Sequence, residues 1–393
     1  MRILTFSTLF PNVALPQNGI FVAERLRHLV ASNTVDATVI APVPWFPAIS
    51  GLFPAYSKWA AVPQKDVFEG IQVLHPRYPV IPKIGMSIAP ALLAAWTLRT
   101  LRKQLAEGPG FDIIDAHYFY PDGVAATLLG RLVDKPVVIT GRGTDLNLIP
   151  KYRLPRYQIR WAATRASELA TVSESLRRVL IDLGVPERKT RTLRNGVDLD
   201  VFAPMLERAH IRTELGVSGT SLLSVGHLIE RKGHHLAIQA LARLPEFVEL
   251  RIAGDGPMES HLRRIASEQG VENRVHFLGR VQRADLVKAY NAADVLVLAS
   301  SREGMANVLL ESMSCGTPVV ATNVWGAPEV VSEGSGELVA NREPDALAEG
   351  VNRLLERGIS RAGVRSHAEK FSWEATTQGQ LNMFESALRK RKT

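Results

Sequence analysis

The sequence predicts an α/β fold with two doubly wound, Rossmann-like parallel sheets. The chain has 393 residues, which is long for one hydrophobic core and matches two domains of common size. Short apolar runs alternate with amphipathic stretches of helical period, as in parallel sheets that have helices on both faces. This alternation continues to about residue 195 and then starts again, so we expect two separate sheets.

The expected elements follow one another in a regular order along the chain. In the first half, strands are predicted at 2–7, 35–41, 71–75, 112–116, 136–140 and 168–172. Helices are predicted there at 20–30, 88–105, 122–132 and 173–183. In the second half, strands are predicted at 221–225, 249–253, 274–277, 294–298 and 317–321, each before a helical stretch. We therefore expect domains at 1–203 and 204–371 and a last amphipathic helix within 372–393.

The composition is that of an ordinary globular protein, with 46% hydrophobic and 22% charged residues. Cys315 is the only cysteine, which excludes an intramolecular disulfide and indicates a reducing compartment. The first residues, MRILTFSTLF, fit a strand better than a signal peptide. The apolar run near 86–98 contains Pro90 and is too short to span a bilayer. We therefore expect a cytoplasmic protein.

A formal net charge of +8 favours anionic partners. Nucleic acid is not expected, because we find no zinc-ligand spacing, RNA-binding aromatic signature or arginine-rich tract. Nucleotide-sugars and anionic membranes remain as the candidate anionic partners. Residues 79–107 combine Lys83, an apolar helix and a basic cluster of Arg99, Arg102 and Lys103. This pattern favours a helix that covers a sheet, and the alternative is peripheral contact with the inner face of the cell membrane.

The stretch 299–322 links two predicted strands through a loop that contains Glu303 and Gly304. Glu303 and Glu311 are eight positions apart, about 12 Å along a helix axis. The glycine allows close approach of a ligand, and the backbone N–H groups at the helix start suit a phosphate. Those N–H groups belong to Met305, Ala306, Asn307 and Val308. An isolated glutamate pair would be interpreted as two solvated charges on an ordinary helix.

A second candidate phosphate site lies at 225–233, which reads VGHLIERKG. Gly226 ends a predicted strand, and Lys232 follows six residues later where a helix is expected to begin. The lysine ammonium could neutralise a leaving diphosphate.

The motif EGMANVLLE at 303–311, together with VGHLIERKG at 225–233, resembles retaining glycosyltransferases of the family-4 type, which have the GT-B fold. The ordered motifs of this resemblance extend from Gly19 to Glu311. It implies an enzyme of EC class 2.4 that moves a sugar from a nucleoside diphosphate to a hydroxyl of a lipid-linked or saccharide acceptor. It also implies retention of anomeric configuration, no metal and no cofactor, and bacterial polysaccharide assembly as the setting. In such enzymes the last helix packs back on the N-terminal, acceptor-side domain.

The resemblance assigns roles to the residues of the two motifs. Glu303 would orient the sugar hydroxyls, Glu311 would hold the ribose, and Lys232 would stabilise the diphosphate. The family has an arginine where this chain has His227. Either Arg231 replaces that charge, or a neutral His227 donates one hydrogen bond in its place.

His117 lies beyond a predicted strand and matches a family histidine that contacts the transferred sugar. On its own it is equally well explained as a structural histidine. Arg142 and Asp145 would face the acceptor, and helix capping by Asp145 is an equal alternative.

Four further loop residues match the family more weakly. Gly19 would let the donor and the acceptor approach a helix start closely, and Gly254 would pack near the donor. Gly279 and Arg280 end a strand where the family holds the nucleobase largely through the main chain. Each glycine alone is more simply a turn residue. The Asp-x-Asp sequence at 198–200 could suggest a metal site, but the resemblance implies a structural turn, because family members have an Asn-Gly-Val-Asp run at the junction between the domains.

Two other function classes fit the same motifs. A nucleotide-sugar epimerase or hydrolase would consume the donor without an acceptor. A non-catalytic nucleotide-sugar binding protein would bind the donor and form no product.

Overall fold

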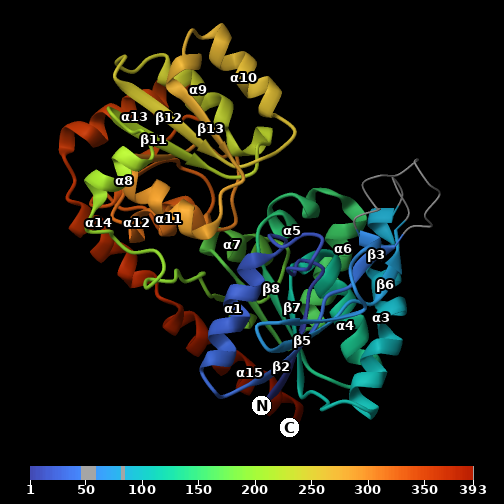
Figure 1. Ribbon diagram of the computed structural model, residues 1–393. Coiled ribbons are helices and arrows are strands. Elements are labelled where there is room, and N and C mark those ends of the chain that lie inside the picture. The colour runs from blue at the N-terminus through green and yellow to red at the C-terminus, as the bar shows by residue number, and fades with distance from the viewer. Residues whose placement is uncertain (46–58, 81–84, 393) are drawn as a thin grey trace. The chain divides into compact units, whose positions relative to one another are not determined.

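The computed structural model describes residues 1–45, 59–80 and 85–392, so Lys83 lies outside the described residues. The chain forms two compact units (Figure 1). One unit consists of Met1–Asn195 together with Trp373–Thr393, and the other of Gly196–Ser372. The first unit is therefore assembled from two parts of the chain that are far apart in sequence.

The first unit contains an eight-stranded sheet in the order β10-β9-β8-β7-β1-β2-β5-β4. Its strands are β1 (Arg2–Phe6), β2 (Asp36–Ile40), β4 (Lys65–Phe68), β5 (Ile71–Leu74), β7 (Ile113–His117), β8 (Val137–Gly141), β9 (Glu168–Thr171) and β10 (Thr190–Thr192). A separate parallel pair is formed by β3 (Val43–Trp45) and β6 (Arg77–Pro79). The order reverses between β1 and β7, as in doubly wound folds.

The edge strand β4 corrects the prediction of a purely parallel sheet. β4 pairs antiparallel with β5, whereas the other neighbouring strands of this sheet pair in parallel. Glu69 and Gly70 join the two strands, and both have positive φ angles. A two-residue turn of this kind matches the twist of a hairpin, which explains the antiparallel pairing.

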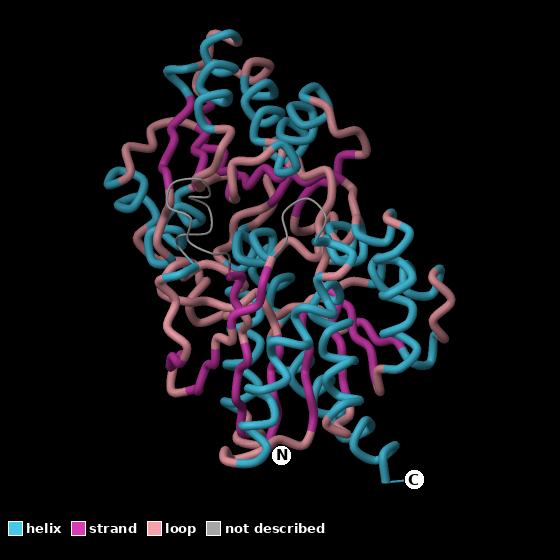
Figure 2. Tube along the Cα trace, turned by 90° about the vertical axis from the view of Figure 1, so that its right-hand side faces the viewer, coloured by secondary structure: helices cyan, strands magenta, loops and turns pink. Residues whose placement is uncertain are grey.

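The helices of the first unit form two groups around the sheet (Figure 1). They are α1 (Ile20–Ala31), α3 (Ala89–Ala106), α4 (Val124–Leu132), α5 (Thr144–Asn147), α6 (Arg153–Arg165), α7 (Glu174–Asp182) and α15 (Trp373–Lys392). The chain's last helix, α15, packs against α1, and α4 packs against α3 and α6. Figure 2 shows strands of this unit side by side with helices over them. Met383 and Phe384 of α15 are buried in the same core as Ile3 and Val22.

The second unit contains a six-stranded parallel sheet in the order β13-β12-β11-β14-β15-β16. Its strands are β11 (Thr220–Val225), β12 (Val248–Ala253), β13 (Val275–Gly279), β14 (Val295–Leu298), β15 (Val319–Thr322) and β16 (Gly336–Val339). This is the strand order of a dinucleotide-binding fold, and its topological switch point lies between β11 and β14.

Seven helices are described in the second unit. They are α8 (Arg208–Glu214), α9 (His234–Leu241), α10 (Glu259–Glu268), α11 (Arg283–Ala292), α12 (Asn307–Ser314), α13 (Pro344–Arg357) and α14 (Arg361–Ala368). Apolar side chains of α9, α10 and α13 share one buried core with the strands. In the described part of the chain, no helix has both the length and the apolar character needed to cross a membrane.

Candidate active site

The two motifs of the second unit meet at its topological switch point. Lys232 lies in η5 (Glu230–Lys232), in the loop after β11, and Glu303 lies in the loop after β14. The Lys232 Nζ donates to Glu303 Oε1 at 2.7 Å. Because β11 and β14 are neighbours with parallel direction, their carboxyl ends bring these two loops together. Ligands of such sheets bind in the crevice at this position.

Glu303 is the centre of a charged cluster. Besides Lys232, the Ser300 hydroxyl donates to its Oε1 at 2.7 Å, and Arg231 Nη1 lies 3.5 Å from its Oε2. Burial alone would raise the pKa of Glu303, but the charges of Lys232 and Arg231 and the hydrogen bonds lower the pKa below its ordinary value. The cluster of two cations and one carboxylate therefore keeps one positive charge, which favours an anionic ligand.

Backbone packing holds Lys232 close to the loop after β14. Gly233 has a φ of 74°, and a Cβ at this position would lie 2.0 Å from the carbonyl oxygen of Ala299. Ser301 N–H also donates to the Arg231 carbonyl at 2.8 Å. Only glycine combines this φ with such close backbone approach. The glycine that ends the 225–233 motif thus sets the position of the lysine before it.

Three further predicted donor residues lie at neighbouring strand ends. His227 follows β11, Gly254 follows β12, and Arg280 follows β13. A Cβ at Gly254 would lie 1.9 Å from the Gly226 carbonyl oxygen, so the loops after β11 and β12 touch. Asp255 lies 4.0 Å from His227 Nδ1 and 3.2 Å from Arg280 Nη2. The sequence did not single out Asp255, which connects these two half-exposed side chains.

The helix α12 begins at Asn307, as the sequence predicted, and follows Gly304, Met305 and Ala306. Glu311 lies on this helix and accepts a hydrogen bond from the Tyr290 hydroxyl at 2.7 Å. Burial and the nearby Glu311 charge raise the pKa of Tyr290 well above its ordinary value, so the hydroxyl stays a donor. Tyr290 was not predicted, because α11 is separate in sequence from the glutamate motif.

In the first unit, His117 lies at the end of β7 and is buried, with 1% of its surface exposed. Arg142 Nη2 donates to its Nδ1 at 2.8 Å, so Nε2 carries the proton and donates to Asp115 at 3.0 Å. Burial, with a further contribution from Arg142, lowers the pKa of His117 to about 4, although Asp115 opposes this shift. Both ring nitrogens of the neutral imidazole are therefore used inside the unit.

The network around His117 extends to the last helix. Gln380 of α15 donates to Asp115 at 2.8 Å and accepts from Arg25 of α1 at 2.7 Å. Arg142 also donates to Asn195 at 2.9 Å. The predicted site residues His117 and Arg142 are thus in direct contact, and α15 fixes their surroundings.

Asp145 lies inside α5, whose N-cap residue Gly143 has no side-chain cap hydrogen bond, so the expected helix capping by Asp145 is not found. Asp145 is fully buried, and its carboxylate accepts from the backbone N–H groups of Phe119, Arg142 and Gly143 at 2.6 to 3.1 Å. These bonds fix the loops after β7 and β8. The predicted contact of Asp145 with an acceptor stays a prediction.

The loop after β1 is held by a carboxylate that the sequence analysis did not predict. Asp122 accepts hydrogen bonds from the Thr8 N–H at 2.8 Å and from the Ser7 hydroxyl at 3.3 Å. Burial raises the pKa of Asp122 to about 7. Gly19 lies immediately before α1, at the end of this loop.

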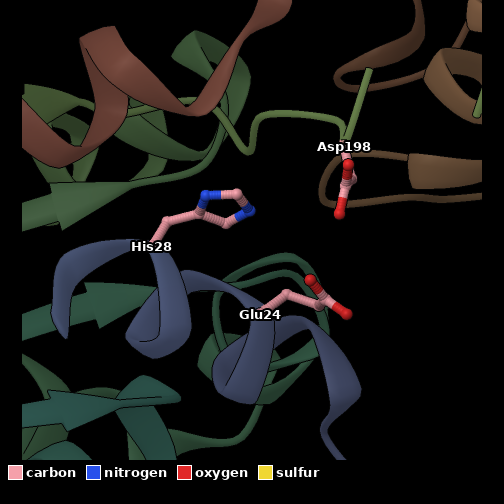
Figure 3. Close-up of side chains that lie close together, drawn as sticks. All are labelled: Glu24, His28 and Asp198. Carbon is pink, nitrogen blue, oxygen red and sulfur yellow. The ribbon is translucent and has the colours of Figure 1, made fainter. Parts of the chain in front are cut away.

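One glutamate and one histidine side chain of α1 lie on the same side of the helix. Figure 3 shows Glu24 and His28, which are four positions apart, projecting from α1 toward the same side. Asp198, also drawn there, belongs to the second unit, where it accepts from the Val201 N–H at 3.2 Å and lies 3.4 Å from Arg283. Two ligands on α1 do not by themselves define a metal site.

Two doubly wound units, each with a topological switch point in its sheet, are the architecture of the GT-B fold. The family model for glycosyl transferases group 1 matches residues 210–371, and the model for glycosyltransferase family 4 matches residues 21–201. The chain is 30% identical to the D-inositol 3-phosphate glycosyltransferase of Acidothermus cellulolyticus, over 95% of this chain and 86% of that protein. The chain therefore belongs to the family of glycosyl transferases group 1, and it is a glycosyltransferase.

Solved structures agree with the fold. HepE of Anabaena, in a complex with UDP, is similar with a TM-score of 0.74 and 22% identity, over 98% of this chain and all of that chain. Sucrose-phosphate synthase of Thermosynechococcus elongatus is similar with a TM-score of 0.76 and 21% identity, over 97% of this chain and 98% of that chain. At these identities the similarity shows the GT-B fold alone.

Proposed function

We propose that this glycosyltransferase moves a sugar from a nucleoside diphosphate to an acceptor hydroxyl, with retention of anomeric configuration and without a metal ion. The observation that supports this most directly is the pair of Lys232 and Glu303 at the switch point of the second unit, 2.7 Å apart. A cation beside a carboxylate suits a ligand that has a diphosphate at one end and sugar hydroxyls at the other. HepE of Anabaena, which has the same fold, was solved in complex with UDP and with UDP-glucose.

The proposed reaction breaks the bond between the anomeric carbon and the diphosphate oxygen and forms a bond to the acceptor oxygen. Negative charge builds on the departing diphosphate, and Lys232 and Arg231 stabilise it without a metal. Glu303 orients the sugar hydroxyls, and the leaving phosphate accepts the proton of the acceptor hydroxyl. The start of α12, from Gly304 to Val308, binds the phosphates, and Glu311 holds the ribose.

The acceptor is proposed to be a saccharide or a lipid-linked saccharide in polysaccharide or glycoconjugate assembly. Arg142 and His117 belong to the acceptor-side unit in this proposal. Because both nitrogens of His117 are bonded within that unit, contact of His117 with the sugar requires one of these bonds to open.

The proposal is tested by a donor screen followed by a transfer assay. Thermal shift with UDP-, GDP- and ADP-sugars identifies the donor, and product formation with saccharide acceptors identifies the reaction. Lys232→Ala is expected to lower kcat about 10²–10³-fold, the usual effect of losing one transition-state charge contact. The control is Lys288→Ala, which removes a lysine that pairs with Glu214 on the surface of the same unit.

Two outcomes would contradict the proposed function. Conversion of the donor to an epimer or a free sugar, at equal rates with and without acceptor, would identify an epimerase or hydrolase. Donor binding with no product from any acceptor would identify a binding protein. Equal activity of the Lys232→Ala and Lys288→Ala variants would remove Lys232 from the mechanism.

A further inference from the structure

The charged residues of helix α6 and the turn before it are all positive. Residues 146–167 contain no aspartate or glutamate, and they contain the cations Lys151, Arg153, Arg156, Arg160 and Arg165. Within the described residues, the first four of these cations have no carboxylate partner, whereas several cations of other surface helices pair with a carboxylate on the same helix. Examples of such pairs are Arg177 with Glu174, Arg263 with Glu259 and Arg353 with Glu349.

Large apolar side chains lie between these cations. Tyr152, Leu154 and Tyr157 are 49%, 49% and 66% exposed, although residues of these types are usually more buried. The opposite side of α6 is buried through Ile159 and Ala162. Arg153, Tyr157 and Arg160 follow a helical spacing, so basic and aromatic groups share the outward face.

A second apolar segment lies beside α6. Gln158 of α6 donates to the Ser87 carbonyl at 2.9 Å, which fixes η1 (Gly85–Ser87) against the helix. Met86 in η1 and Ile88 just after it are 39% and 42% exposed. The outward face of α6 together with Met86 and Ile88 is called the α6 surface below.

The chain topology places part of the α6 surface at one edge of the sheet. α6 follows β8 and precedes β9, which run parallel, so its first turns lie toward the carboxyl ends of the strands. The loops after β7 and β8, which contain Arg142, lie at the same edge. Ligands of parallel sheets bind at this edge.

We propose that the α6 surface docks on an anionic lipid surface and thereby brings the carboxyl edge of this sheet to an acceptor held in that surface. Cations attract anionic head groups, and Leu154, Met86 and Ile88 enter the boundary with the acyl chains. Arginine side chains can extend their charged ends to the head groups while their stems lie in the apolar layer. A nucleic acid would attract the same cations but offers no apolar layer for these side chains. The link to an acceptor rests on the proposed function, whereas the docking itself does not.

The test uses the full chain and vesicles of phosphatidylcholine, alone or with about a third of the lipid replaced by phosphatidylglycerol. The chain is expected to sediment with the anionic vesicles only. The triple variant Arg153→Gln, Arg156→Gln, Arg160→Gln is expected to lower partitioning about 100-fold, because each cation near an anionic surface contributes about fivefold. The matched control, Arg263→Gln, Arg264→Gln, Arg353→Gln, removes the same charge from the second unit and should bind nearly as the unchanged protein does.

A second variant separates lipid docking from binding to charge alone. Leu154→Ser with Tyr157→Ser keeps every cation and is expected to lower vesicle binding at least tenfold, most clearly at high salt. The proposal would be overturned if both triple variants lost vesicle binding equally, or if the Leu154→Ser, Tyr157→Ser variant bound vesicles as the unchanged protein does. It would also be overturned if the chain bound a DNA duplex in preference to anionic vesicles.

The proposed function is measured separately in the same variants. Thermal shift with the donor and transfer to a water-soluble acceptor should be unchanged in all of them, which also shows that they fold. If vesicle binding follows the expected pattern but no transfer is found, only the proposed function fails.

Discussion

At the residue scale, Glu311 depends on a hydroxyl that lies on another helix. Tyr290 is fully buried, and its hydroxyl bond to Glu311 holds the carboxylate that we propose for the ribose. Removing this bond should loosen the ribose contact and leave the diphosphate cluster around Lys232 in place. The effect is therefore expected on donor binding more than on chemistry.

We expect Tyr290→Phe to raise the donor KM about fivefold with little change in kcat, because one hydrogen bond contributes about 1 kcal/mol. Steady-state kinetics with varied donor measures both constants. Tyr120→Phe removes the hydroxyl of a buried tyrosine that bonds Gln158 in the first unit and is the matched control. A fall in kcat with an unchanged KM would place Tyr290 in the chemical step.

His117 provides a pH prediction at the same scale. Its folded-state pKa of about 4 lies below the ordinary value of 6.5 because the ring is buried. Between these two values the unfolded chain binds more protons than the folded chain, so folding stability is expected to fall as the pH drops from about 6.5 to about 4. His117→Gln should weaken this dependence.

Proton NMR of the imidazole measures the His117 titration directly, with the His117→Gln spectrum as the assignment control. A midpoint at or above 6.5 would contradict the buried network of His117, Arg142 and Asp115. Urea unfolding at several pH values measures the accompanying change in stability.

The sequence could indicate the charged residues of the candidate site but not the residues that bond to them. Lys232 and Glu303 stand beside glycines in loops after apolar strands, and this pattern is local. Gln380 and Asp115 are in contact although they are 265 positions apart, and Tyr290 reaches Glu311 from a neighbouring helix. Such contacts depend on how elements pack, which periodicity and spacing do not specify.

At the element scale, predicted strands and helices with strong periodicity were found, and those with weak periodicity were missed. α6 was not predicted, because Pro155 and the many arginines obscure its apolar side, which consists mainly of small residues. β4 was also missed, because its residues alternate between exposed and half-buried positions at the sheet edge. Edge strands have one unpaired side and hence a weaker apolar pattern.

The loop that positions Lys232 can be tested through Gly233. Gly233→Ala forces a Cβ against the Ala299 carbonyl oxygen at 2.0 Å in addition to the strain of its positive φ. We expect a loss of about 3 kcal/mol or more in unfolding free energy, together with weaker donor binding. Urea unfolding and thermal shift with the donor measure these effects.

Gly270→Ala is the matched control for that variant. Gly270 has a similar φ of 67°, but no atom lies within 4 Å of a Cβ there, so only the backbone strain of about 1 kcal/mol is expected. Equal losses for the two variants would show that the contact with Ala299 does not position the loop.

At the scale of the whole molecule, the first unit is completed by the end of the chain. α15 contributes Phe384, which is fully buried, to the core formed with Ile3 and Val22. It also contributes Gln380 to the network around His117. The last helix should therefore behave as part of the first unit, even though residues 196–372 separate the two parts in sequence.

We expect Phe384→Ala to lower the stability of the first unit by about 3–5 kcal/mol, the usual cost of deleting a buried phenylalanine ring. Hydrogen exchange measured by mass spectrometry should show lost protection in peptides from 1–195 and little change in peptides from 196–372. Leu354→Ala, which removes a buried side chain of α13, is the matched control and should give the opposite pattern. Loss of protection confined to α15 itself would show that the helix is an appendage that the first sheet does not need.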